Sequence, residues 1–276
     1  MSTTIRLQTS ETQPFILLPA HVNGKGPFDF VLDTGASMSI MTEELASVIG
    51  IEGTEIKEGL GSAGRKIEVP LGKVDSISIG EIRVEDVRVG ILKEYPKCVG
   101  SHGALGYNFF KDFVLTIDYR RNLLTFTSPA DKRHHGRLPR TNTPLRLARP
   151  DRPIPLVDVL INTRETYQFI LDTGASQTIV SPELAQQMNI TDTKPDLIIG
   201  AGGATKSSFG ILKSLSIGKA SLKNITVIVA DIFSALGEAA EAKFDGILGF
   251  NFLSNFLLEI DYPNRNLRFK EQPNAG

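Results

Sequence analysis

The chain has 276 residues and a mass of 30.1 kDa, which is enough for two compact domains of ordinary size. Thirty Lys and Arg residues balance 31 Asp and Glu residues with no long run of one sign, which excludes the usual charge footprint of nucleic-acid or anionic-membrane binding. The single cysteine, Cys98, excludes an internal disulfide framework. With no export signal and no apolar run of membrane-spanning length, we expect a cytoplasmic protein; a periplasmic or secreted location would require a removed signal.

Two stretches of the sequence repeat each other. Residues 28–37 read FDFVLDTGAS, and residues 167–176, 139 positions further on, read YQFILDTGAS. Three further pairs of segments match in the same order: 42–46 with 181–185, 61–64 with 200–203, and 105–110 with 248–253. The spacing changes slightly along the chain, as insertions in loops would produce. The sequence therefore predicts an internal duplication.

Each repeat begins with apolar strands, the last of which runs directly into Asp-Thr-Gly. A short helix is predicted next, because Thr42 and Ser181 are good N-cap residues and acidic residues follow each of them. Gly50 in the first repeat and Asn189 in the second can adopt the left-handed conformation that ends a helix. We therefore expect one helix after each Asp-Thr-Gly motif.

Each repeat also closes in the same way. Two apolar strands joined by a polar turn predict terminal hairpins over residues 113–126 and 256–269. Residues 129–143 are polar and lack apolar periodicity, as is typical of a linker. We therefore predict two domains, 1–143 with the linker at its end and 144–276. Short β-branched runs bounded by Gly and Pro make the predicted fold mainly β.

Asp33 and Asp172 occupy equivalent positions in the two repeats. Equivalent repeats can pair about a local twofold axis, and a group near that axis meets its counterpart. Two carboxyls at close range do not readily ionise together, so one can act as a base toward water while the other donates a proton to a substrate carbonyl. Gly35 and Gly174 would let the backbone approach these carboxyls closely. The pattern favours amide hydrolysis by a water activated between the two aspartates.

The two Asp-Thr-Gly-Ala-Ser motifs, each paired with a later apolar-apolar-Gly segment at 103–106 or 246–249, resemble the retropepsin and pepsin superfamily of aspartic proteases. The resemblance covers nearly the whole chain. It implies two pseudo-twofold-related, retropepsin-like β-barrel or sandwich lobes in a pepsin-like bilobal architecture. The usual retropepsin homodimer would here be fused into one chain.

The resemblance also implies roles for individual residues. Asp33 and Asp172 would form the catalytic dyad, and Thr34 and Thr173 would brace the two loops through their hydroxyls. A glycine-rich hairpin tip would close over the substrate cleft as a flap. The flap residues expected in this way are Gly61, Ser62, Ala63 and Gly64 in the first repeat, and Gly200, Ala201, Gly202 and Gly203 in the second.

Some positions depart from the family pattern. Ser37 and Ser176 stand where retropepsins commonly carry Asp, and Tyr107 and Phe250 stand where they carry the Arg that pairs with it. Pepsins commonly place Ser after Asp-Thr-Gly, whereas this chain has Ala, which cannot donate a side-chain hydrogen bond to the dyad. Fewer donors to an ionised carboxylate leave its pKa higher. We therefore expect activity at mildly acidic to neutral pH.

Two alternatives fit parts of the same pattern. A catalytically silent protein of this fold would keep the motifs and bind peptides without cutting them. A glycosidase also uses paired carboxyls, but the absence of Trp argues against a sugar-binding platform. The glycines at 59–64 lack the βαβ context of a nucleotide site, and His134 and His135 lack a clustered third metal ligand.

The sequence thus predicts a monomeric aspartic endopeptidase whose substrate is a peptide or protein. Its cleft would run between the two lobes, with the two aspartates at the floor. No metal or organic cofactor is expected, and neither is a nucleic-acid or membrane partner.

Overall fold

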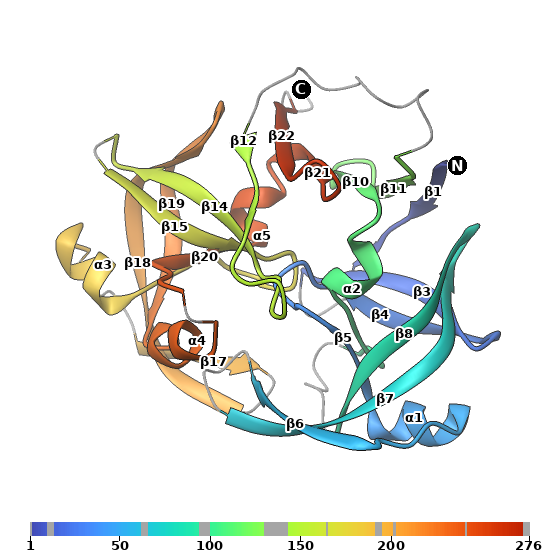
Figure 1. The fold of residues 1–276 in the computed structure, drawn as a ribbon. Helices are drawn as coiled ribbons and strands as arrows, with labels where there is room; N and C mark the ends of the chain where they lie inside the picture. The colour runs from blue at the N-terminus through green and yellow to red at the C-terminus, as the bar shows by residue number, and fades with distance from the viewer. Residues whose placement is uncertain are drawn as a thin grey trace.

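The protein is bilobal and built mainly from strands, as the sequence predicts (Figure 1). The computed structural model describes residues 2–9, 14–61, 66–93, 100–129, 143–163, 165–190, 195–200, 203–240 and 242–272. These residues form two eight-stranded sheets, each from one repeat, and one six-stranded sheet to which both repeats contribute. Among the described helices, none is long and apolar enough to cross a membrane.

The two eight-stranded sheets have the same topology. The first has the order β2 (Gln8–Thr9), β3 (Ile16–Val22), β4 (Lys25–Leu32), β9 (Gly103–Leu105), β5 (Ser39–Thr42), β8 (Ile82–Leu92), β7 (Lys66–Ile79), β6 (Glu55–Leu60). The second has the order β13 (Arg146–Leu147), β14 (Pro155–Ile161), β15 (Glu165–Leu171), β20 (Gly246–Leu248), β16 (Ile179–Val180), β19 (Ala220–Ala230), β18 (Gly203–Ile217), β17 (Pro195–Gly200). In each, the strand that leads into Asp-Thr-Gly pairs in parallel with the short apolar strand before the later glycine. The duplication read from the sequence is therefore also a duplication of fold.

The six-stranded sheet joins the two repeats. Its order is β1 (Ser2–Arg6), β11 (Leu123–Thr127), β10 (Val114–Asp118), β21 (Phe256–Asp261), β22 (Asn266–Glu271), β12 (Thr143–Pro144). The predicted terminal hairpins are confirmed as β10–β11 and β21–β22. Their first strands also pair with each other, antiparallel, with Thr116 opposite Glu259. The predicted linker lies outside the described residues except at its ends, and the domain boundary at residue 143 stays a prediction.

The helix predicted after each Asp-Thr-Gly motif is present. In α1 (Glu43–Ile49) the Thr42 hydroxyl accepts a hydrogen bond from the Leu45 N–H at 3.2 Å, and Gly50 ends the helix at φ 79°. In α3 (Pro182–Gln187) the Ser181 hydroxyl accepts from the Leu184 N–H at 3.1 Å. Side-chain capping therefore fixes where both helices start.

Three other helices were not expected from the sequence. One-turn helices α2 (Tyr107–Phe110) and α5 (Phe250–Leu253) follow the later glycine of each repeat. Helix α4 (Phe233–Ala240) occurs in the second repeat, in the segment where the spacing between repeats changes, and it packs against β6 of the first repeat. This helix is therefore a difference between the described parts of the two lobes.

Phenylalanine side chains fill the core beneath the six-stranded sheet. Phe110 and Phe126 are both 0% exposed, and their rings stack with centroids 6.4 Å apart. Phe109 packs edge to face on Phe126 at 6.3 Å, and Phe252 and Phe269 form the equivalent contact in the second repeat at 6.4 Å. Because α2 and α5 supply one ring to each pair, this packing fixes the short helices that follow the later glycine of each repeat.

We expect the Phe110→Ala substitution to lower the free energy of unfolding by about 3 to 5 kcal/mol, because it leaves a cavity in the core. Urea denaturation followed by far-ultraviolet circular dichroism measures this change. Val48→Ala on α1 is the control: Val48 is 57% exposed, so the expected change is within about 0.5 kcal/mol. A similar loss for both variants would contradict this account of the core.

Candidate active site

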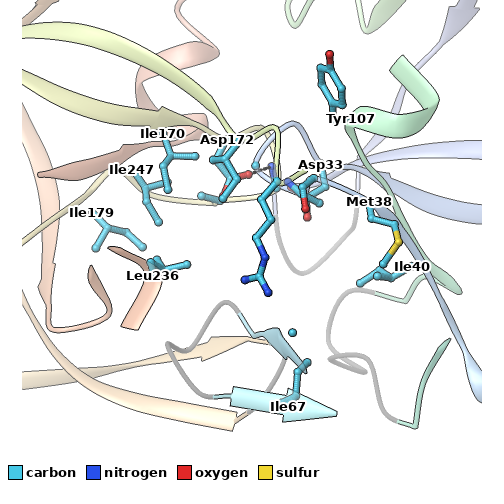
Figure 2. Close-up of a pocket in the computed structure, with 18 of the residues that line it drawn as sticks. Asp33, Met38, Ile40, Ile67, Tyr107, Ile170, Asp172, Ile179, Leu236 and Ile247 are labelled. Atoms are coloured by element: carbon cyan, nitrogen blue, oxygen red, sulfur yellow. Dashed lines mark hydrogen bonds between the residues drawn. The ribbon is translucent and has the colours of Figure 1, made fainter. Parts of the chain in front are cut away.

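Asp33 and Asp172 lie at the ends of equivalent strands, β4 and β15, and Figure 2 shows their side chains directed toward each other. Each backbone N–H continues the parallel pairing of its strand. The Asp33 N–H donates to the Leu105 carbonyl at 3.0 Å, and the Asp172 N–H donates to the Leu248 carbonyl at 3.1 Å. The strand register therefore places both carboxyls at the same level on either side of the pseudo-twofold axis.

The two threonines that follow these aspartates hold the loops together. The Thr34 hydroxyl accepts from the Thr173 N–H at 3.0 Å and donates to the Leu171 carbonyl at 2.8 Å. The Thr173 hydroxyl accepts from the Thr34 N–H at 3.1 Å and donates to the Leu32 carbonyl at 2.6 Å. Both side chains are buried, so each hydroxyl satisfies one donor and one acceptor that water does not reach.

Gly35 and Gly174 lie against the opposite carboxyl. A Cβ atom on Gly35 would stand 2.6 Å from the Asp172 Cγ, and one on Gly174 would stand 2.9 Å from the Asp33 Cγ. Real Cβ atoms do not approach other heavy atoms so closely, so a side chain at either position would push the two carboxyls apart. The glycine after each threonine is therefore required by the closeness of the aspartates.

The hydrogen bonds to the two carboxyls are not equivalent. The Ala36 N–H donates to Asp33 Oδ1 at 2.9 Å, the Gly174 N–H donates to Asp172 Oδ1 at 2.7 Å, and the two carboxyls hydrogen-bond to each other. Burial raises the pKa of Asp33 well above its ordinary value of 3.8, and the nearby charge of Asp172 raises it further. Burial also raises the pKa of Asp172, but the Gly174 N–H and the hydrogen bond from Asp33 oppose this rise. The raised pKa of both carboxyls indicates that the pair shares one proton, which we assign to Asp33 for the proposed mechanism.

A second pair of polar networks supports the loops, and the sequence analysis missed it. Asn108 Oδ1 accepts from both the N–H and the hydroxyl of Ser39, and this hydroxyl accepts from the Gly106 N–H. In the second repeat Asn251 Oδ1 accepts in the same way from Thr178, whose hydroxyl accepts from a glycine N–H. The signal was available, because both repeats carry Asn three residues after the apolar strand.

Aromatic contacts occupy the region where the retropepsin pattern would place its ion pair. Tyr107 packs edge to face on Tyr262 of the other repeat at 5.6 Å, and Phe250 packs on Tyr119 of the first repeat at 5.5 Å. Burial raises the pKa of the Tyr119 and Tyr262 hydroxyls above its ordinary value of 10.0. Both hydroxyls stay neutral across the physiological range, and these contacts between the repeats do not depend on charge.

A cavity of about 1000 Å³ opens above the two aspartates. Figure 2 shows Ile170, Ile179, Leu236 and Ile247 gathered on one side of the dyad, with Met38 and Ile40 on the other. The side with four labelled residues belongs to the second repeat, and Leu236 reaches it from α4. The cavity is thus a largely apolar cleft with two carboxyls at its floor.

The two hairpins expected to act as flaps both line this cavity. Residues of β6 and β7 line it from the first repeat, and residues of β17 and β18 line it from the second. Gly200 and Gly203 pair at the end of the second hairpin. Of the other expected flap residues, Gly61 is described, whereas Ser62, Ala63, Gly64, Ala201 and Gly202 lie outside the described residues.

The cleft holds no arrangement suited to a metal ion. Among the described residues, no group of three or more His, Cys, Asp or Glu side chains could coordinate one. His134, His135 and Cys98, which the sequence analysis considered, lie outside the described residues.

A bilobal β fold that brings two Asp-Thr-Gly loops together at the floor of a cleft has the architecture of the aspartic proteases. The chain belongs to the aspartyl protease family, whose sequence profile matches residues 18–109 and 157–252. The two matched segments correspond to the two repeats. Among curated proteins, none matches the chain by sequence.

A solved structure shows the same fold over nearly the whole chain. The crystal structure of an aspartic proteinase from Irpex lacteus is similar with a TM-score of 0.59 and 14% sequence identity, over 99% of this chain and 98% of that one. The retropepsin-like aspartic protease from Rickettsia conorii is 21% identical over 46% of this chain and 91% of its own, with a TM-score of 0.36. The similarity over nearly the full length of the Irpex enzyme shows that the two lobes together form a pepsin-like fold.

We expect Thr34→Val to lower the free energy of unfolding by about 2 to 5 kcal/mol, because it leaves a buried N–H and a buried carbonyl of the opposite loop unpaired. Thr34→Ser is the matched control, since it keeps the hydroxyl and should retain most of the stability. Urea unfolding curves of the two variants measure the difference. Equal losses for Val and Ser would show that the hydroxyl is not the stabilising group.

The raised pKa of Asp33 predicts how stability depends on pH. In wild type, the stability that comes from the bound proton is fully present below about pH 4 and is lost as pH rises through the folded-state pKa. Asn does not titrate, so Asp33→Asn should melt several degrees above wild type near neutral pH and close to wild type near pH 3. Melting temperatures across this range measure the difference. A gain that is constant with pH would contradict the assignment of the proton to Asp33.

Proposed function

We propose that the protein is an aspartic endopeptidase that hydrolyses peptide bonds with a water held between Asp33 and Asp172. The observation that supports this proposal most directly is the pair of hydrogen-bonded carboxyls, one from each repeat, at the floor of the cleft. The cleft walls are largely apolar, which suits an extended peptide with apolar side chains beside the cut. Gly35 and Gly174 support the dyad by permitting its close approach.

In the proposed mechanism the two carboxyls have different roles, because one starts protonated and the other starts charged. Asp172, which keeps its charge, accepts a proton from the water as the water oxygen bonds to the substrate carbonyl carbon. Asp33, which holds the proton, donates it to the carbonyl oxygen, so that a neutral tetrahedral intermediate forms. When the C–N bond breaks, the proton on Asp172 passes to the leaving nitrogen, and a hydroxyl proton of the intermediate returns to Asp33. No covalent bond between substrate and protein forms in these reaction steps.

The same geometry argues against sugar hydrolysis. Carboxyl pairs in glycosidases stand roughly 5 to 9.5 Å apart, because a sugar ring and, in some enzymes, a water must fit between them. In this protein the two carboxyls are in direct hydrogen-bond contact. A single water above the pair is the arrangement that amide hydrolysis needs.

Hydrolysis of denatured casein between about pH 3 and pH 8 tests the proposal. We expect cleavage with an optimum at mildly acidic to neutral pH, because burial raises the pKa of both carboxyls. Asp33→Asn and Asp172→Asn should each reduce the rate by at least about a thousandfold, and a statine-type transition-state inhibitor should block the wild type.

Two variants control for effects on folding. Asp112→Asn and Asp158→Asn remove a carboxylate from each repeat outside the lining of the cleft, so cleavage should persist in both. If the folded wild type cuts no peptide at any pH, the protein is a peptide-binding module and the catalytic proposal is wrong. Binding of the statine-type inhibitor can still be measured in that case, since a binding module would retain affinity for it.

A further inference from the structure

A short loop of the second repeat lines the cleft. Residues 151–154 all line the cavity, and Pro153 among them is buried. Two backbone hydrogen bonds fix this loop: the Ala148 N–H donates to the Ile154 carbonyl at 2.9 Å, and the Ile154 N–H donates to the Arg152 carbonyl at 2.8 Å. The loop therefore presents the Arg152 side chain from a defined backbone position.

Arg152 reaches across the cleft to the first repeat. Its guanidinium donates to the Glu58 carbonyl on β6 at 3.2 Å, and the side chain is half-buried. Residue 59 on the same strand pairs with Ile67 of β7, which Figure 2 shows at the opposite end of the cavity from the dyad. Arg152 thus lies between the floor of the cleft and one of its hairpin walls.

The positive charge of Arg152 is not matched by a carboxylate of the described residues within ion-pairing distance. The nearest acid in sequence, Asp151, binds Arg149 with both oxygens, at 2.8 and 3.1 Å. The Glu58 carboxylate binds Lys66 at 2.9 Å. A guanidinium has five N–H donors, and a backbone carbonyl uses one of them. Donor capacity and charge therefore remain for a ligand in the cleft.

We infer that Arg152 is a specificity-determining residue that selects peptides with an Asp or Glu side chain near the apolar residues at the scissile bond. A carboxylate is the natural partner of a guanidinium, because two parallel N–H donors match its two oxygens. This inference rests on the proposed function only in taking the ligand of the cleft to be a peptide.

Binding to the Asp33→Asn protein tests the inference without requiring catalysis. The probes are fluorescent octapeptides with blocked ends and a central Leu-Phe pair, in which one Glu is moved through the other six positions against a Gln control. We expect one position, or two adjacent ones, at which the Glu peptide binds about tenfold tighter than its Gln counterpart at low salt. The preference should shrink as salt is added.

Two substitutions in the same Asp33→Asn background assign the preference to a residue. Arg152→Gln should reduce the Glu-to-Gln affinity ratio to about one. Lys57→Gln also removes one positive charge from the cleft wall, on β6, but Lys57 already neighbours Glu55 at 3.6 Å, so this variant should keep the preference. Because each ratio compares two peptides on the same variant, a general loss of folding or affinity cancels.

Three results would overturn the role of Arg152: no Glu preference at any position, a preference that survives Arg152→Gln, or no binding of any peptide. A loss of preference in Lys57→Gln as large as in Arg152→Gln would also overturn it. The summed positive charge of the cleft wall, and not Arg152 alone, would then cause the preference. If the Asp33→Asn protein shows the preference while the wild type cuts nothing, hydrolysis is refuted and the selectivity of Arg152 stands.

Discussion

Four hydrogen bonds exchanged by Thr34 and Thr173 fix how closely two carboxyl groups approach each other inside this protein. Each carboxyl alone would be an ordinary acid at the end of a strand. Held together and partly buried at the floor of the cleft, they cannot both carry a charge at low cost, so one proton is retained between them. The glycines at the dyad, the parallel strands behind it and the asparagine networks all serve to keep this contact short.

The six-stranded sheet and the aromatic contacts hold the two repeats together around this contact. The sheet aligns β10 with β21 across the pseudo-twofold axis, so the lobes cannot rotate apart without breaking backbone hydrogen bonds. Tyr107 and Tyr262, with Phe250 and Tyr119, add packing between the repeats that neither salt nor pH weakens. An ion pair in the same place would depend on the charge state of a carboxylate.

Much of this arrangement was predictable because the same motifs occur in both repeats of the sequence. Two Asp-Thr-Gly motifs in equivalent positions predict that Asp33 and Asp172 meet, and Thr42 and Ser181 predict the helix starts by local hydrogen-bonding chemistry alone. The pairing of β10 with β21 was not predictable, because it joins residues far apart in sequence and either hairpin alone offers the same exposed edge. The packing of α4 on β6 and the contact of Arg152 with Glu58 were missed for a related reason, because each joins residues that are far apart in sequence.

Fusion of the two repeats into one chain also allows the two halves of the cleft to carry different side chains. In a homodimer of one such repeat, both walls carry the same side chains, and an extended peptide meets identical surroundings whether it runs one way or the other. Here Lys57 on β6 corresponds in the repeat to Asp196 on β17, and both line the same cleft. Tyr107 likewise corresponds to Phe250. A peptide bound in the cleft, as the proposed function requires, would therefore meet different side chains in its two orientations, so a sequence and its reverse would not be equivalent ligands.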